Sequence, residues 1–201
     1  MLEQVYSEVK KSLHSAESLY YSLVLLVGQS GTRKSKILNK LAQELGTSVI
    51  NANLIISGQL LEFTSKQRAL RLPSILDEIC SHAKSIVILD NIEVLFDKSL
   101  MQDPLKLLQS ISRNRIVLSS WNGKFLQKKL LYAEIGHPEF KFYENADAII
   151  VDMNSNTPIG IETKHCEAEQ AGSTEALFNL IRYSQSFCYV TQINWEPLIN
   201  W

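Results

Sequence analysis

The sequence LVLLVGQSGTRKS, residues 23 to 35, decides the fold class of this chain. Five apolar residues come first and end at a glycine, as in a strand that is buried on both faces. The next residues share the first glycine, the lysine and the serine of the pattern G-x-x-x-x-G-K-[ST], but Arg33 occupies the place of its last glycine. Residues 35–45 then place apolar side chains on one helical face and stop at Gly46. A strand, a glycine-rich loop and a helix in this order predict a phosphate-binding loop.

Such a loop binds a nucleoside triphosphate through backbone N–H groups at the start of the helix, where the helix dipole also favours an anion. The lysine would contact the outer phosphates, and the serine hydroxyl would contact Mg²⁺. We therefore predict ATP and Mg²⁺ as ligands, although the loop contacts only phosphates and does not distinguish adenine from guanine. The predicted nucleotide-binding residues are Gly28, Gly31, Thr32, Arg33, Lys34 and Ser35.

A second apolar stretch, SIVILDNIE, ends in an acid about fifty residues later. Asp90 at the end of this strand is predicted to hold Mg²⁺ together with Ser35, through the water shell that magnesium keeps. Hydrolytic proteins of this class often carry a glutamate directly after that aspartate, but here the position is Asn91. Glu93 is the nearest carboxylate. It either orients the attacking water or is a solvated residue at a helix start, and the sequence leaves both open.

The segment SSWNG, residues 119 to 123, follows a further apolar run. Asn122 is the candidate for a polar side chain between the γ-phosphate and the attacking water. A plain Asn-Gly turn after a strand explains the same residues equally well. An arginine that stabilises the transition state is also expected. The sequence does not choose among its candidates, which are Arg33, Arg68, Arg71, Arg113 and Arg115.

The rest of the chain alternates predicted strands and helices, which indicates an α/β fold with a parallel sheet covered on both faces. We predict a P-loop NTPase three-layer sandwich with five parallel strands in the additional-strand arrangement, and with the Asp90 strand beside the Lys34 strand. A basic turn, TSKQRALR, should precede a helix that begins at Pro73. The predicted parts are an amphipathic helix (1–19), the P-loop domain (20–152) and a C-terminal extension of uncertain fold (153–201).

The composition restricts the function classes only weakly. The chain has 201 residues and a formal net charge of −1, so any contact with DNA would use a local patch. Three widely spaced cysteines do not form a disulfide framework or a zinc motif. No apolar run reaches the roughly 20 residues of a membrane span, and no signal peptide is evident, so we expect a cytoplasmic protein without a membrane contact.

Residues 19–151 resemble BrxF, a family of small P-loop proteins of type 3 bacteriophage exclusion (BREX) systems in bacteria. The resemblance extends over VINANLIISGQLLEF, KQRALR, LLYAEIGHPEFKFY and a long segment that begins VILDNIEVLFDKSL. It implies a P-loop NTPase in phage defence, with other phage-exclusion proteins as partners. Members typically have G-x-x-G-x-G-K-[ST] in the loop, so Arg33 is a departure, whereas Asn91 and Glu93 agree with the family's DNIE.

Two other functions remain open. Asp152 ends one apolar run, and Glu162 and Lys164 follow at the spacing of a PD-(D/E)xK nuclease site, in which two carboxylates bind Mg²⁺ and the lysine assists the water. Alternatively, the chain is a scaffold that keeps the fold without turnover. Only about fifty residues follow Asp152, too few for a full helical lid, so a second copy or a partner should close the site.

Overall fold

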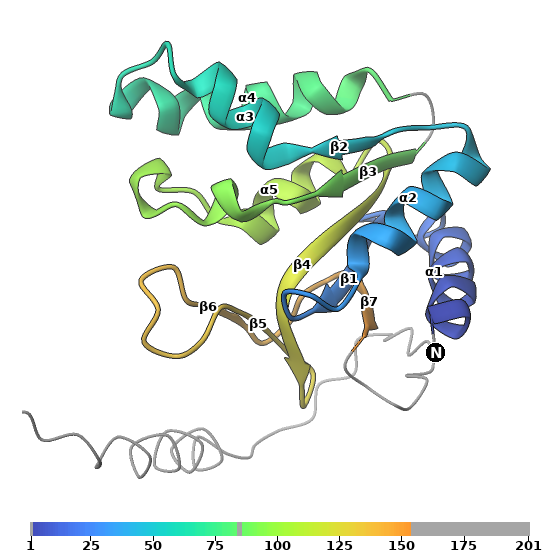
Figure 1. The fold of residues 1–201 in the computed structure, drawn as a ribbon. Helices are drawn as coiled ribbons and strands as arrows, with labels where there is room; N and C mark the ends of the chain where they lie inside the picture. Colours follow the sequence, from blue (N-terminus) through green and yellow to red (C-terminus); the bar gives the residue numbers. More distant parts are fainter. Residues whose placement is uncertain (1, 84–85, 154–201) are drawn as a thin grey trace, which may run out of the picture. The chain divides into compact units, whose positions relative to one another are not determined.

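The computed structural model describes residues 2–83 and 86–153, and within them five parallel strands form the predicted sheet (Figure 1). Their order is β2-β3-β4-β1-β7, so the α/β class and the five parallel strands are confirmed. The phosphate-loop strand β1 is paired on both sides, with β4 and with β7. The five strands are β1 (Leu23–Gly28), β2 (Val49–Asn51), β3 (Ile86–Asp90), β4 (Ile116–Leu126) and β7 (Ile149–Asp152).

The prediction that the Asp90 strand lies beside the Lys34 strand is wrong. β4 lies between β1 and β3 and pairs in parallel with both. All six residues of β1 are buried, and an apolar strand of this kind needs a neighbour on each side. A strand inserted at this position is what the additional-strand arrangement requires, so that part of the prediction stands.

Helices cover both faces of the sheet, which gives three layers (Figure 1). α1 (Leu2–Ala16) and α2 (Lys34–Leu45) pack on the face that contains Val24 and Leu26. α3 (Ala52–Leu60), α4 (Ser65–Ser81) and α5 (Pro104–Ile111) pack on the opposite face, against Leu23 and Leu25. Alternate residues of one strand thus belong to two cores.

The helix expected to begin at Pro73 begins eight residues earlier, at Ser65. Thr64 and Gln67 form a capping box, so the predicted basic turn is the first part of α4. Pro73 lies inside the helix and has no N–H to donate to the carbonyl of Ala69. The side-chain amide of Gln102 donates to that carbonyl instead, at 2.8 Å. This bond explains how the helix continues through the proline.

β4 continues beyond the parallel sheet and forms a three-stranded antiparallel extension that the sequence analysis missed. It pairs with β5 (Lys129–Tyr132), which in turn pairs with β6 (Lys141–Tyr143). Gln127 and Lys128 connect the first two strands, both at positive φ, as in the two-residue type I′ turn of a hairpin. Asn122 therefore lies inside a strand, and the Asn-Gly turn is excluded.

Predictions for residues beyond 153 lie outside the described residues. They include the extension's secondary structure, the absence of a lid, and Glu162 and Lys164. Asp152 is described, at the end of β7. Cys80 is buried in α4, and burial raises the pKa of its thiol to about 11. Across residues 2–83 and 86–153, no helix combines the length and the apolar character that crossing a membrane requires.

Candidate functional site

The loop between β1 and α2 has the shape of a phosphate cradle. Gly28 ends β1, and a Cβ atom added there would lie 2.6 Å from the Thr32 hydroxyl oxygen. That hydroxyl donates to the carbonyl of Gln29 at 2.7 Å and so folds the loop back on itself. Gly31 has φ of 84°, in the left-handed region that favours glycine. Gly31 is therefore favoured by its backbone conformation, and Gly28 by the close approach of the Thr32 side chain.

Arg33 adopts a left-handed conformation, which favours the glycine of the motif. It is the N-cap of α2, with φ 66° and ψ 25°, and it makes no side-chain capping bond. A residue with a Cβ costs about 1–2 kcal/mol in this left-handed region. The side chain is exposed, and the helix still begins at the next residue. Arg33 thus strains the loop, and α2 still begins directly after it.

Lys34 is buried inside the loop and is 7% exposed. Its ammonium group donates to the carbonyls of Gly28 and Gln29, at 2.7 and 2.8 Å, and to the Thr32 hydroxyl at 3.3 Å. Burial lowers the pKa of this lysine, and the carboxylates of Asp90 and Glu93 oppose that shift. These bonds hold the ammonium group within the loop, where a phosphate oxygen would compete with the carbonyls for it.

Asp90 ends β3 at the same edge of the sheet and is also 7% exposed. One of its carboxylate oxygens accepts a hydrogen bond from the backbone N–H of Asn91, at 3.0 Å. Asn91 itself has φ of 54°, a conformation that asparagine tolerates better than glutamate. The chain therefore turns directly after the strand, and η1 (Glu93–Phe96), a short 3₁₀ helix, follows. This turn explains why the first usable carboxylate is at position 93.

The structure brings the two predicted catalytic residues together. The side-chain amide of Asn122 donates to the Glu93 carboxylate, although 29 positions separate them in the sequence. Asn122 is also the register partner of Gly28, the first residue of the loop, on the neighbouring strand. Glu93 is consequently held by a hydrogen bond and is not a freely solvated residue. The sequence offered no signal for this pair.

Four aromatic side chains pack beside Glu93. Phe96 stacks on Tyr132, and Trp121 meets Phe96, Tyr132 and Tyr143 edge-on. Burial raises the pKa of the Tyr132 hydroxyl, and the carboxylate of Glu93 raises it further. Two of these rings belong to the antiparallel extension, so the extension forms one wall of the region around Glu93.

The candidate arginines lie in different places and have different partners. Arg113 lies over the rings of Tyr20 and Tyr21, and Arg115, just before β4, pairs with Asp77 at 3.1 Å. Both therefore lie at the amino ends of the strands, away from the loop of their own chain. Arg68 donates to the carbonyl of Phe63 at 2.8 Å, and Arg71 lies 4.7 Å from the Phe63 ring.

The residues fit Mg²⁺ bound together with a nucleotide. Ser35 is exposed in the first turn of α2, and Asp90 ends a strand two positions away from β1, about 10 Å across the sheet. Magnesium keeps most of its waters and needs few protein oxygens, so such a separation suits it. Nowhere in the described ranges do three His, Cys, Asp or Glu residues cluster around a metal position. A dedicated all-protein metal site is thus absent from them.

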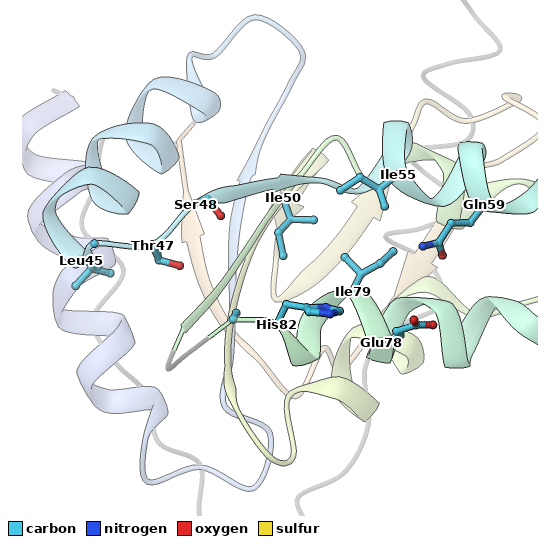
Figure 2. A pocket seen from close by; sticks show the side chains of 11 residues that line it. Leu45, Thr47, Ser48, Ile50, Ile55, Gln59, Glu78, Ile79 and His82 are labelled. Atoms are coloured by element: carbon cyan, nitrogen blue, oxygen red, sulfur yellow. The ribbon is translucent and has the colours of Figure 1, made fainter.

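A cavity of about 620 Å³ lies away from this site, beside the edge strand β2 (Figure 2). Ile50, Ile55 and Ile79 give it an apolar floor, and Gln59 and His82 lie at its polar rim. The C-terminal end of α2 borders it, whereas the phosphate loop precedes the other end of that helix. The predicted site residues do not line this cavity.

One family model supports the prediction of a nucleotide-binding P-loop domain. The profile of the family described as "ATPase family associated with various cellular activities (AAA)" matches residues 24–118, which include the phosphate loop and Asp90. The fold is that of a P-loop NTPase. No curated protein matches the chain. A structure of C. elegans PCH-2 is similar to 76% of this chain, with 19% sequence identity and a TM-score of 0.44, and the chain spans 42% of that protein.

The P-loop fold also bears on the rival nuclease prediction. Asp152 would be the first carboxylate of that site, but its strand pairs with β1 in the register of Val27 with Asp152. The strand is therefore part of the sheet that supports the phosphate loop. The other two residues of that prediction, Glu162 and Lys164, lie outside the described residues.

Proposed function

We propose that the chain is an ATP-binding P-loop protein with weak or partner-dependent ATPase activity, acting in the cytoplasm as a component of a bacterial BREX phage-defence complex. The observation that carries the nucleotide part is Lys34, buried between the loop carbonyls with Asp90 and Glu93 close by. The long resemblance to BrxF carries the phage-defence part. The chain's partners would be other proteins of that system or a second copy.

Each residue has a proposed role in this function. The loop N–H groups and Lys34 bind the phosphates, while Ser35 and Asp90 hold Mg²⁺, which neutralises phosphate charge when bound. Glu93 orients a water for attack, and Asn122 fixes the Glu93 carboxylate. Weak turnover follows from the starting arrangement, because Lys34 must leave the carbonyls of its own loop before it can contact a phosphate.

Closure of the site would come from outside the described part of this chain. Of the five arginines, Arg113 and Arg115 are directed to other partners at the opposite edge. Arg68 and Arg71 lie together near the start of α4, where both contact Phe63. We propose this pair as the group that reaches the nucleotide site of a neighbouring subunit.

Calorimetric titration with Mg²⁺–ATP tests the proposal. Wild type should bind, and Lys34→Ala should weaken binding by at least tenfold, because it removes a charge-assisted bond to phosphate. Lys36 is an exposed lysine two residues further along α2. Lys36→Ala should bind like wild type and is the matched control. Binding that is unchanged in Lys34→Ala would overturn the site.

The same protein preparations distinguish the remaining functions. Phosphate release that depends on Glu93 supports an ATPase, whereas binding without release supports a scaffold that keeps the nucleotide. Mg²⁺-dependent DNA cleavage that is lost in Lys164→Ala and kept in Lys34→Ala would favour the nuclease. For the BREX role, Lys34→Ala should abolish phage exclusion when it replaces the wild-type protein in a complete type 3 system.

A further inference from the structure

The outer side of the antiparallel extension carries a surface that the nucleotide site does not use. Beyond Asn122, β4 pairs with β5, and β5 pairs with β6 (Figure 1). The side chains alternate between the two sides of these strands. One side carries Leu130 and Tyr132 and is buried against the aromatic cluster. The other side, which we call the lysine face, consists of Lys124, Leu126, Lys129, Leu131 and Phe142.

The strand register places these five residues close together. Leu131 is the direct partner of Lys124 on β4 and of Phe142 on β6. Lys129 lies on the same strand two residues before Leu131, so it is a diagonal neighbour of Lys124, roughly 7–8 Å away. Its ammonium group is 5.4 Å from the centre of the Phe142 ring. The face therefore combines two cations with an aromatic ring and two aliphatic side chains.

The positive charge of this face is not neutralised within the described part of the chain. Lys124 is exposed, and neither it nor Lys129 forms an ion pair with a carboxylate from residues 2–83 or 86–153. Residues 116–143 contain four lysines and two glutamates, whereas the whole chain has a net charge of −1. Both glutamates, Glu134 and Glu139, belong to the connection between β5 and β6. The three strands thus carry only basic charges.

We propose that the lysine face binds single-stranded nucleic acid. Lysines attract the phosphate backbone, and the half-buried Phe142 ring beside Lys129 offers a base a surface to stack on. Leu126 is 51% exposed and extends this apolar surface along β4. An acidic peptide would use the lysines but not the ring, and a duplex would keep its bases stacked on each other. The mixture of cations and an aromatic ring on a sheet therefore favours an unpaired strand.

The proposal has a consequence for the nucleotide site, and this part rests on the proposed function. Asn122 precedes Lys124 by two residues and lies on the same side of β4. A strand bound at Lys124 would therefore lie next to the residue that holds Glu93. We expect bound nucleic acid to change ATP turnover through this side chain.

Fluorescence anisotropy with a labelled oligothymidylate, as DNA and as the RNA equivalent, tests binding on the full-length protein. Binding should weaken at least tenfold in Lys124→Glu/Lys129→Glu, and the dependence on salt should fall by about 0.7 in log–log slope for each lysine removed. Phe142→Leu keeps an apolar side chain but removes the ring, and should weaken binding about tenfold. Lys11→Ala, an exposed lysine of α1, should have no effect.

Three outcomes would overturn the proposal: no binding by wild type, equal binding by the lysine variant, or equally effective competition by polyglutamate. Lys34→Ala separates this proposal from the proposed function. This variant should lose ATP binding but should still bind the oligonucleotide like wild type. Unchanged thermal unfolding of the lysine variant shows that its folding is intact, as expected for side chains on the solvent side.

Discussion

At the scale of single residues, position 33 shows how a P-loop sequence can depart from its pattern and still form the loop. Arg33 has φ of 66°, where glycine has no steric cost and arginine does. The neighbours tolerate this because Lys34 is tied to three loop oxygens and because α2 is anchored by buried leucines. The strain is therefore local.

We predict that Arg33→Gly stabilises the protein. Removing the strained Cβ contributes about 1–2 kcal/mol, and the greater freedom of glycine in the unfolded chain offsets about half of this gain. The net increase in the free energy of unfolding, measured in urea, should be roughly 0.5–1 kcal/mol. Arg33→Ala removes the charge but keeps the Cβ, so it should give no gain. Equal stabilisation by both variants would assign the effect to charge instead of backbone strain.

We predict that Lys34 makes both the stability and the ATP affinity of the protein depend on pH. Burial lowers its pKa below the ordinary value of 10.5, so the folded protein releases this proton at a lower pH than the unfolded chain does. Stability therefore rises with pH between the lowered pKa and 10.5, because the unfolded state binds more protons there. ATP affinity should change in the opposite direction, because a neutral lysine does not attract phosphate.

Calorimetric titrations between pH values of about 7 and 10 measure this effect on ATP affinity. The affinity of wild type should fall as pH rises, and Lys36→Ala should retain the same profile. The remaining ATP affinity of Lys34→Ala should not show this fall with rising pH. A wild-type affinity that does not vary over this range would contradict the role of the lysine charge.

At the scale of elements, β4 connects the nucleotide site to the antiparallel extension. Gly123 allows the two to meet, because a Cβ added there would lie 1.8 Å from the carbonyl oxygen of Leu131. The same carbonyl accepts a hydrogen bond from the Trp121 indole at 2.9 Å. The close approach of β4 and β5 therefore depends on this one glycine.

We predict that Gly123→Ala destabilises the protein by about 3 kcal/mol, because β5 must move away and the indole loses its acceptor. Chemical denaturation followed by circular dichroism measures the change. Gly58→Ala is the matched control, because Gly58 lies inside α3 with open space around its Cβ position. Alanine there should increase the free energy of unfolding by about 0.5–1 kcal/mol. A neutral Gly123→Ala would show that the hairpin is not packed as described.

The element scale also shows what the sequence could predict. Apolar runs that end in a glycine or an acid predicted β1 and β3, and apolar periodicity with Gly46 as its stop predicted α2. The start of α4 was missed because Pro73 resembles a first-turn proline, and its tolerance depends on Gln102, which is distant in sequence. β5 and β6 were missed because Gln127 and Lys128 are unusual residues for a type I′ turn.

At the scale of the whole molecule, local patterns identified residues but not their neighbours. Gly28 and Asp90 end two strands of one parallel sheet, and Lys34 begins the helix after the loop, so these three predicted residues lie at one edge of the sheet. The bond between Asn122 and Glu93 could not be predicted, since it exists only because β4 enters between β1 and β3. Strand order is a property of the folded sheet, and short-range sequence patterns contain little information about it.

That strand order also determines when the loop can form during synthesis. β1 has its partners in β4 and β7, and the second of these ends at Asp152, more than a hundred residues later. At about 5–20 residues per second, the ribosome needs roughly 6–25 seconds to make that length. For most of this interval, until β4 is complete at Leu126, the buried strand β1 has neither of its partners. Translation speed through residues 29–152 would therefore influence how much of the protein escapes aggregation.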